Sequence, residues 1–269
     1  MLVDGLHIDH LRLILGTSMG GMQTWMWGER YPQMMDGLVP IASQPVAIAG
    51  RNWLWRQVII SAIRNGPDWH GGDYGIEDNR FGYHNGDLSR GLQVLFRPWP
   101  TQWIRTMPVL ALMTGDPAGM YATAPDRAAS VRMYDTLVEQ AAMEDANDVL
   151  YAFESARDYD PESQLSKIRA PLYAINFTDN LLDTTDSCME QKLIHSIPLG
   201  RYQDVFPGNK QYGHMTLAHP EVWKGVLTDL LSYITERQST TRPIGWLVTF
   251  PGDWCPPGPD CEKCRNELY

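Results

Sequence analysis

Gly16-Thr17-Ser18-Met19-Gly20 is the most informative segment of this chain of 269 residues for predicting its fold. It follows a short apolar run, residues 11–15, and precedes residues 22–30, in which apolar side chains recur at helical spacing. This order predicts a buried strand that passes through a tight turn into a helix. Tyr31-Pro32 predicts the end of that helix.

Ser18 is the candidate nucleophile. The stretch fits the pattern G-x-S-x-G, in which a sharp strand-to-helix turn lifts a serine hydroxyl above the carboxyl edge of a sheet. Glycine is expected on both sides of the serine, because the turn and the close approach of strand and helix leave no room for side chains. The backbone N–H of Met19 is then the candidate donor to an oxyanion. A glycine-rich turn with a purely structural role is the alternative interpretation.

A serine hydroxyl needs a base to take its proton, and His214 is the candidate. It lies between a predicted strand at residues 201–206 and a predicted helix at residues 220–236, so its loop should fall at the carboxyl edge of the sheet. His219 is the reserve. The other histidines precede the serine, lie in a presumed insertion or belong to an amphipathic stretch: His7, His10, His70, His84 and His195.

Asp179 is the candidate acid that orients the histidine. It directly follows the strand-like run at residues 171–177, and a carboxylate at a strand end can accept the second N–H of the imidazole. Asp183 and Asp186 are alternatives, although both lie farther into the loop and could simply cap the next helix.

The order of predicted elements indicates an α/β fold with a mainly parallel sheet and helices on its faces. A second strand is expected at residues 37–42, after the helix that follows Ser18. Amphipathic segments at residues 53–63 and 128–142, separated by glycine- and proline-rich turns, predict a helical insertion. The expected parts are a core at 1–43 and 169–237, a helical cap or lid at 44–168, and an irregular C-terminal tail at 238–269.

Composition excludes several classes of function. The chain has 22 basic and 32 acidic side chains, a net charge of −10, which argues against nucleic acid or an anionic membrane as the main partner. No apolar run approaches the ~20 residues of a membrane span, and residues 1–10 lack the features of a secretory signal, so a cytoplasmic location is expected.

Cysteines occur only at Cys188, Cys255, Cys261 and Cys264. They are too few and too clustered to staple the chain. A zinc or redox site at the last three is disfavoured, because a second ligand pair at zinc spacing is absent. We therefore expect neither a metal nor another cofactor.

The motifs as a set resemble those of the homoserine O-acetyltransferase family of α/β-hydrolase-fold enzymes. Besides the stretch around Ser18 and Tyr31-Pro32, the resemblance rests on five further motifs spread over residues 11–236 in the family's order. They are Pro67-Asp68-Trp69, Gly71-Gly72-Asp73-Tyr74, residues 145–160 from Asp145-Ala146-Asn147-Asp148 to Asp158-Tyr159-Asp160, Asp179-Asn180-Leu181 and Gly213-His214.

The resemblance implies a triad of Ser18, Asp179 and His214, an acyl-enzyme intermediate and a cap that shapes the acceptor pocket. The substrate would be a small ester, a thioester or an amino-acid-like alcohol, with acetyl-CoA as an acyl donor. Transfer to an alcohol and hydrolysis by water both fit. Arg97 is close to the place where the family holds its amino-acid substrate but out of register, so a carboxylate clamp and a structural arginine are both open.

The sequence departs from the family in what precedes the nucleophile strand. About ten residues come before Leu11, too few for the strands that such a fold places there, one of whose loops supplies the second oxyanion donor. We expect either that the sequence is the carboxyl portion of a longer protein, or that a partner chain, as in a homodimer, covers the strand edge. The alternative function is a catalytically weak homologue that acts as an interaction module through that edge.

Overall fold

The fold is known from a computed structural model, which describes residues 2–74, 102–183 and 189–239. The described residues form two compact units. The sheet unit takes its residues from Met1–Val46, Pro161–Lys210 and Met215–Tyr269, and the helical unit takes its residues from Ala47–Asp160 and Gln211–His214.

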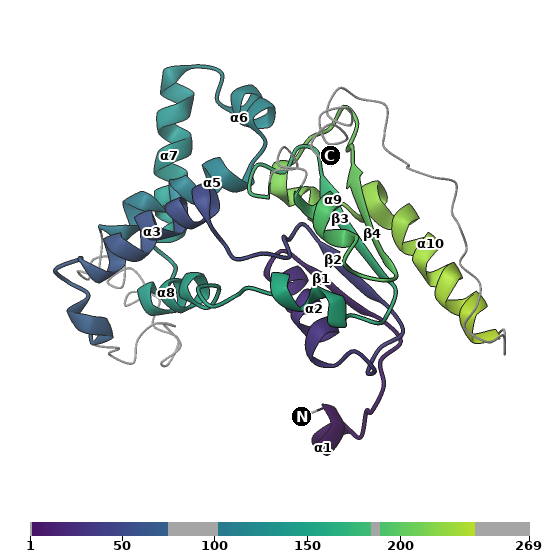
Figure 1. Cartoon of the computed structure of the whole chain (residues 1–269). Coiled ribbons are helices and arrows are strands. Elements are labelled where there is room, and N and C mark those ends of the chain that lie inside the picture. The colour runs from purple at the N-terminus through teal and green to yellow at the C-terminus, as the bar shows by residue number, and fades with distance from the viewer. Residues whose placement is uncertain (1, 75–101, 184–188, 240–269) are drawn as a thin grey trace, which may run out of the picture. The chain divides into compact units, whose positions relative to one another are not determined.

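The described residues of the sheet unit form four parallel strands in the order β1-β2-β3-β4 (Figure 1). Their bounds are Ile14–Thr17 for β1, Leu38–Ile41 for β2, Leu172–Phe177 for β3 and Gly200–Val205 for β4. Because all four strands run the same way, their carboxyl ends meet at one edge of the sheet. The predicted parallel sheet is therefore confirmed.

The first strand begins later than the sequence predicts. The run at residues 11–15 is apolar except for Arg12, yet β1 starts at Ile14 and reaches Thr17, next to Ser18. Leu11 forms only an isolated bridge with Met35. Two backbone hydrogen bonds keep Leu11 beside the neighbouring segment, from Leu11 N–H to Met34 C=O at 2.8 Å and from Asp36 N–H to Leu11 C=O at 3.0 Å.

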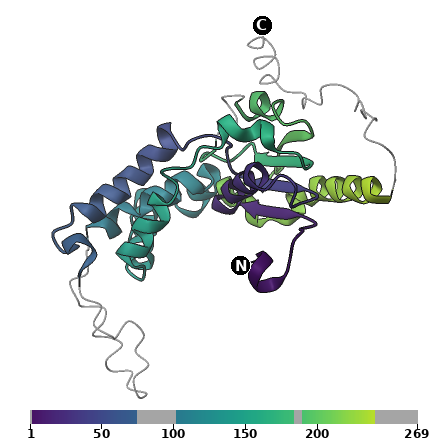
Figure 2. The ribbon, with the colours of Figure 1, turned by 60° about the horizontal axis from the view of Figure 1, so that its bottom comes forward.

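Helices cover both faces of the sheet, as Figures 1 and 2 show. Successive strand residues point to opposite faces, so Leu38 and Leu172 pack on one side and Val39 and Tyr173 on the other. The helices of this unit are α1 (Leu2–Leu6), α2 (Met19–Arg30), η4 (Glu162–Lys167), α9 (Met189–Ile194), η6 (Gly213–Ala218, which starts in the helical unit) and α10 (Pro220–Ser239).

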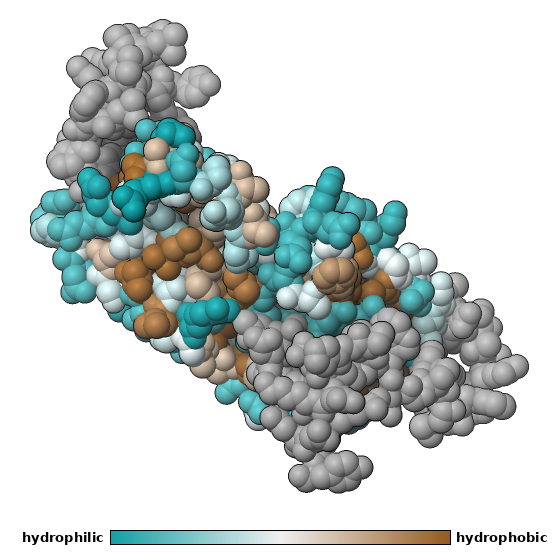
Figure 3. Space-filling view, turned by 90° about the horizontal axis from the view of Figure 1, so that it is seen from above, coloured by the Kyte–Doolittle hydropathy of each residue, from teal (hydrophilic) through white to brown (hydrophobic). Residues whose placement is uncertain are grey.

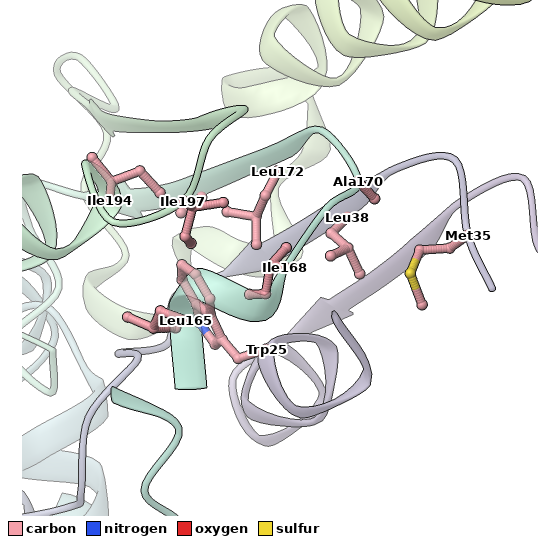
Figure 4. Close-up of a cluster of buried hydrophobic side chains, with 10 residues drawn as sticks. Trp25, Met35, Leu38, Leu165, Ile168, Ala170, Leu172, Ile194 and Ile197 are labelled. Carbon is pink, nitrogen blue, oxygen red and sulfur yellow. The ribbon is translucent and has the colours of Figure 1, made fainter. Parts of the chain in front are cut away.

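Trp25 anchors the first of these two cores. It is 1% exposed and packs from α2 among residues of the sheet, η4 and α9, as the close-up in Figure 4 shows. Its ring N–H donates a hydrogen bond of 3.2 Å to the hydroxyl of Ser43, which satisfies the one polar atom of the side chain. On the opposite face, Leu230 and Ile234 of α10 pack against the sheet. The helix α2, which directly follows the turn of Ser18, is thus held by a packed core.

The helical unit contains no strand in its described part. Three of its helices begin at an aspartate whose carboxylate accepts backbone N–H groups of the first turn: Asp116, Asp126 and Asp145. Its helices are α3 (Gly50–Arg64), η1 (His70–Gly72), η3 (Trp103–Thr106), α5 (Pro108–Thr114), α6 (Pro117–Thr123), α7 (Arg127–Ala141) and α8 (Ala146–Glu154).

Apolar side chains also lie on the surface of the helical unit, which is the left part of Figure 3. Leu54, Leu112, Val131 and Met143 are all more than half exposed. Exposed apolar residues are ordinary on protein surfaces, so these four by themselves indicate no partner.

Candidate active site

Ser18 occupies the turn between β1 and α2. Its φ of 52° and ψ of −118° place it in a region that non-glycine residues rarely adopt. The turn is held by two backbone hydrogen bonds, from Ser18 N–H to Ile41 C=O at 2.8 Å and from Met22 N–H to Ser18 C=O at 3.0 Å. A strained serine at the carboxyl end of a parallel strand is the geometry expected of a nucleophile turn.

The glycines around Ser18 do not all serve the purpose that the sequence suggests. A Cβ atom on Gly16 would collide with the carbonyl of Gly20, and one on Gly21 would come within 2.9 Å of the carbonyl of Ile41. A Cβ atom on Gly20 would meet nothing within 4 Å. The prediction that both flanking glycines are needed for space is therefore wrong for Gly20, because a side chain at this position would point into open space.

Met19 is the first residue of α2. The N–H groups in the first turn of a helix have no partner within the helix, and the helix dipole makes that end attractive to negative charge. The backbone N–H of Met19 is thus suited to bind an oxyanion beside Ser18.

Asp179 follows β3 and is 8% exposed. β3 is two strands away from β1 in the sheet, so the carboxyl ends of these strands lie about 10 Å apart at ~4.8 Å per strand. Ser18 and Asp179 therefore lie on the same edge of the sheet.

A network of buried amides holds the loop that carries Asp179. Asn176 donates to the backbone carbonyl of Asp183 at 2.9 Å, and Asn180 donates to the side-chain oxygen of Asn176 at 2.8 Å. Asp183, the first alternative acid, is 4% exposed and belongs to this network, which favours a structural role for it. Asp186, the second alternative, lies outside the described residues.

The carboxylate of Asp179 is tied to η6. Thr216 donates a hydrogen bond of 2.8 Å from its hydroxyl to Oδ2 of Asp179, and the threonine is 0% exposed. His214 lies two residues before Thr216 in the same short helix. The structure thereby links the segment of the acid to the segment of the predicted base. The full triad of Ser18, Asp179 and His214 stays a prediction.

His214 is buried, with 4% of its surface exposed. Burial lowers the pKa of His214 to about 4, and the positive charge of Arg56 adds to this effect. The imidazole is therefore neutral at pH 7 and able to accept a proton. His219, the reserve, lies nearer the surface, where its Nδ1 is 3.1 Å from a carboxylate oxygen of Glu221.

Gly213, directly before His214, lies in close contact with the backbone of Thr114 and Gly115. Its φ is 63°, and a Cβ atom there would come within 2.5 Å of the carbonyl of Gly115 and 2.8 Å of that of Thr114. Only glycine fits this close approach, so position 213 requires glycine both for space and for its backbone conformation.

Two residues with clear roles escaped the sequence analysis, Arg56 and Thr216. Arg56 is 5% exposed, donates to the side chain of Asn52 at 3.1 Å, and lies over the rings of Trp55 and Phe153. An asparagine four residues before an arginine on a helix is a signal that could have suggested its pairing. Thr216 gave no such signal, because its partner is distant in the chain.

The motifs at residues 67–74 and 145–148 meet inside the helical unit and bind each other. The ring N–H of Trp69 donates to Asn147 at 2.8 Å, and the hydroxyl of Tyr74 donates to Asp145 at 2.7 Å. Asn147 in turn donates to the carbonyl of Gly72 at 3.0 Å. These motifs therefore support the architecture of the unit.

Several predicted features lie outside the described residues: Arg97, His84, all four cysteines, residues 184–188 and the tail from residue 240. Among the described residues, no three His, Cys, Asp or Glu side chains are grouped as ligands of a metal ion. In the same part of the chain, none of the helices combines the length and the hydropathy that a membrane crossing requires.

Comparison with known proteins supports the resemblance. The chain matches no protein-family model. The homoserine O-acetyltransferase of Corynebacterium urealyticum is 43% identical over 77 residues, which are 27% of this chain and 19% of that enzyme. That of Haemophilus influenzae is 29% identical over 226 residues, which are 79% of this chain and 59% of that enzyme. The chain thus spans less than two thirds of the length of these relatives.

Solved structures show the same fold. The homoserine O-acetyltransferase from Bacillus anthracis aligns with a TM-score of 0.68 and 17% identity, over 87% of this chain and 62% of that one. An acetylester hydrolase from Corynebacterium glutamicum aligns with a TM-score of 0.64 and 14% identity, over 87% of this chain and 64% of that one. The predicted α/β-hydrolase fold is confirmed, as is the resemblance to homoserine O-acetyltransferases.

Proposed function

We propose that this chain, with its α/β-hydrolase fold and its similarity to homoserine O-acetyltransferases, carries the active site of an acyl-transfer enzyme with Ser18 as the nucleophile. The observation that carries the proposal is the strained backbone of Ser18, φ 52°, at the carboxyl end of β1. Such strain persists only where the surrounding structure holds it, and it concentrates at functional sites.

The proposed reaction has two halves. His214 takes the proton of the Ser18 hydroxyl while the serine oxygen bonds to the carbonyl carbon of an ester or thioester. Asp179 orients the imidazole, and the N–H of Met19 binds the oxyanion. The proton then passes to the departing alkoxide or thiolate as its bond to the carbonyl carbon breaks, which leaves an acyl group on Ser18. In the second half, an alcohol or water attacks the acyl group, His214 takes its proton, and the serine leaves with that proton.

Three features support these roles. A neutral, buried His214 is in the protonation state that a general base needs. The link from Thr216 to Asp179 ties the acid to the helix of His214. The first-turn position of Met19 gives a donor directly beside the nucleophile.

The acceptor of the acyl group decides between transfer and hydrolysis. The relatives are named for both outcomes, as homoserine O-acetyltransferases and as an acetylester hydrolase. We propose a short acyl group, acetyl above all, with an ester or acetyl-CoA as the donor. An amino-acid-like alcohol such as homoserine would accept it where water is excluded.

A fluorophosphonate probe tests the nucleophile. We expect the folded protein to be labelled at Ser18, and the Ser18→Ala variant to remain unlabelled at equal concentration. Peptide mass mapping identifies the labelled residue. Labelling of the variant at the wild-type rate, or none of the folded wild type, would refute the proposal. Product analysis with acetyl-CoA, with and without homoserine, then separates transfer from hydrolysis.

The second candidate function is an interaction module. Within the described residues β1 is an edge strand paired only with β2, and Leu15 on it is 40% exposed. An uncovered strand edge offers N–H and C=O groups to another strand. Light scattering at several concentrations, together with an esterase assay, tests this candidate. A protein that stays monomeric and also turns over esters rapidly would exclude it.

A further inference from the structure

Thr216 has a buried hydroxyl that donates a hydrogen bond to the carboxylate of Asp179. The residue is 0% exposed, and its Oγ1 lies 2.8 Å from Oδ2 of Asp179, 37 residues away in the chain. Both residues belong to the sheet unit. A hydrogen bond to an ionised carboxylate is among the stronger kinds, and burial removes the competition of water.

The helix η6 carries both this donor and the predicted base. It runs from Gly213 to Ala218, with His214 and Thr216 two residues apart. A 3₁₀-helix rises about 2 Å per residue, so the two residues lie about 4 Å apart along its axis. The bond from Thr216 therefore holds the Asp179 carboxylate against the helix that carries His214.

We infer that Thr216 is a positioning residue, which sets the orientation of the Asp179 carboxylate toward His214. Thr216 holds Oδ2, and in this arrangement Oδ1, the other carboxylate oxygen, accepts the second N–H of the imidazole. An imidazolium that forms during the reaction is stabilised by a carboxylate held in this orientation. This inference rests on the proposed function, since it concerns the same triad.

The alternative role for Thr216 is to hold the loop in place. Other residues already hold this loop: Asn180 donates to the side chain of Asn176, and Asn176 donates to the backbone carbonyl of Asp183. The loop thus has its own supports within residues 176–183. Loss of the threonine hydroxyl should therefore affect the direction of the carboxylate more than the fold of the loop.

The test compares Thr216→Val, which removes the hydroxyl, with Thr216→Ser, which retains it. The readouts are kcat and KM for p-nitrophenyl acetate, the rate of fluorophosphonate labelling, and the unfolding midpoint in urea. Thr228→Val is the matched control, because the Thr228 hydroxyl binds only the carbonyl of Lys224 in α10, at 2.9 Å. We expect Thr216→Val to lower kcat and labelling by about tenfold to a hundredfold, with KM changed less than twofold.

Thr216→Ser and Thr228→Val should both retain most of the wild-type rate. A double-mutant cycle with Asp179→Ala separates positioning from a structural role. If Thr216 acts through Asp179, adding Thr216→Val to Asp179→Ala should change kcat less than twofold. If the valine variant fails to fold, as circular dichroism would show, Thr216→Ala replaces it in the cycle.

The outcomes distinguish this inference from the function on which it rests. Absence of labelling in the folded wild type overturns both. Specific labelling of Ser18, together with wild-type kcat in Thr216→Val, overturns the role of Thr216 and leaves the proposed function standing. Equal losses in the wild-type and Asp179→Ala backgrounds would also overturn it, because the effect would then bypass the acid.

Discussion

The indole N–H of Trp69 donates a hydrogen bond of 2.8 Å to the side-chain oxygen of Asn147, although 78 residues separate them. The same asparagine donates to the backbone carbonyl of Gly72 at 3.0 Å. One amide therefore binds the segment around Trp69 to the start of α8 through both of its polar atoms. The pair explains why the two motifs occur together in this chain: they form one structural joint of the helical unit.

We expect Trp69→Phe to destabilise the protein by about 1–3 kcal/mol, because it leaves the oxygen of Asn147 without this donor in a partly buried place. Urea unfolding followed by circular dichroism measures the loss. Asn65→Ala is the control, since the exposed Asn65 amide only binds Ser61 within its own helix end. A control loss equal to that of Trp69→Phe would contradict the assigned role.

Gly16→Ala should distort the turn of Ser18, because the added Cβ atom would collide with the carbonyl of Gly20 and lie 2.7 Å from the hydroxyl of Thr24. Forcing a group into such a space costs about 1–3 kcal/mol. Gly20→Ala is the matched control: its Cβ meets nothing within 4 Å, and alanine is favoured over glycine in a helix by about 1 kcal/mol. We expect urea midpoints to fall for the first variant and to hold or rise for the second. Equal midpoints would refute this account of the turn.

The pKa of His214 predicts how activity depends on pH. Because burial and Arg56 lower that pKa to about 4, the acidic limb of kcat/KM for an ester should lie below the ordinary histidine range near 6.5. Arg56→Met should move the limb to higher pH, though by less than the whole shift, since burial is the larger cause. Arg56→Lys, which keeps the charge, is the control. A limb near 6.5 in the wild type would contradict the prediction.

Glu190 should make the protein less stable as the pH rises. It is 2% exposed, and burial, with the nearby charges of Asp183 and Asp204, raises its pKa to about 7, although a hydrogen bond with Gln44 opposes the shift. Its ordinary pKa is 4.5. The folded state therefore holds the proton more tightly, so its stabilising contribution is complete below pH 4.5 and is lost as the pH rises through 7.

A shift of this size corresponds to about 3 kcal/mol at 1.36 kcal/mol per pKa unit. We expect Glu190→Gln to raise the free energy of unfolding at pH 8 by a large part of that amount, and to change it little at pH 4. Urea titrations at both pH values measure the difference. An equal effect of the substitution at pH 4 and pH 8 would show that the ionisation of Glu190 is not the cause.

The local order of strand, turn and helix around Ser18 followed from the sequence alone. Apolar runs and breakers predicted the strands at residues 37–42 and 171–177 and the helices at 22–30 and 220–236, because periodicity and glycine or proline signals act within a few residues. The same signals placed the first strand at residues 11–15, whereas β1 covers Ile14–Thr17, because the pairing of a strand with its neighbour decides where the strand begins and ends.

The parallel α/β arrangement and the candidates Ser18, Asp179 and His214 were predictable without coordinates. Their order along the chain and the ends of predicted strands carry that information. Three relations became visible only in the folded chain: Thr216 binds Asp179, burial and Arg56 lower the pKa of His214, and Asn147 accepts the N–H of Trp69. These relations join residues 37, 158 and 78 positions apart, and chain folding sets such contacts through packing and burial, which leave no local periodic trace.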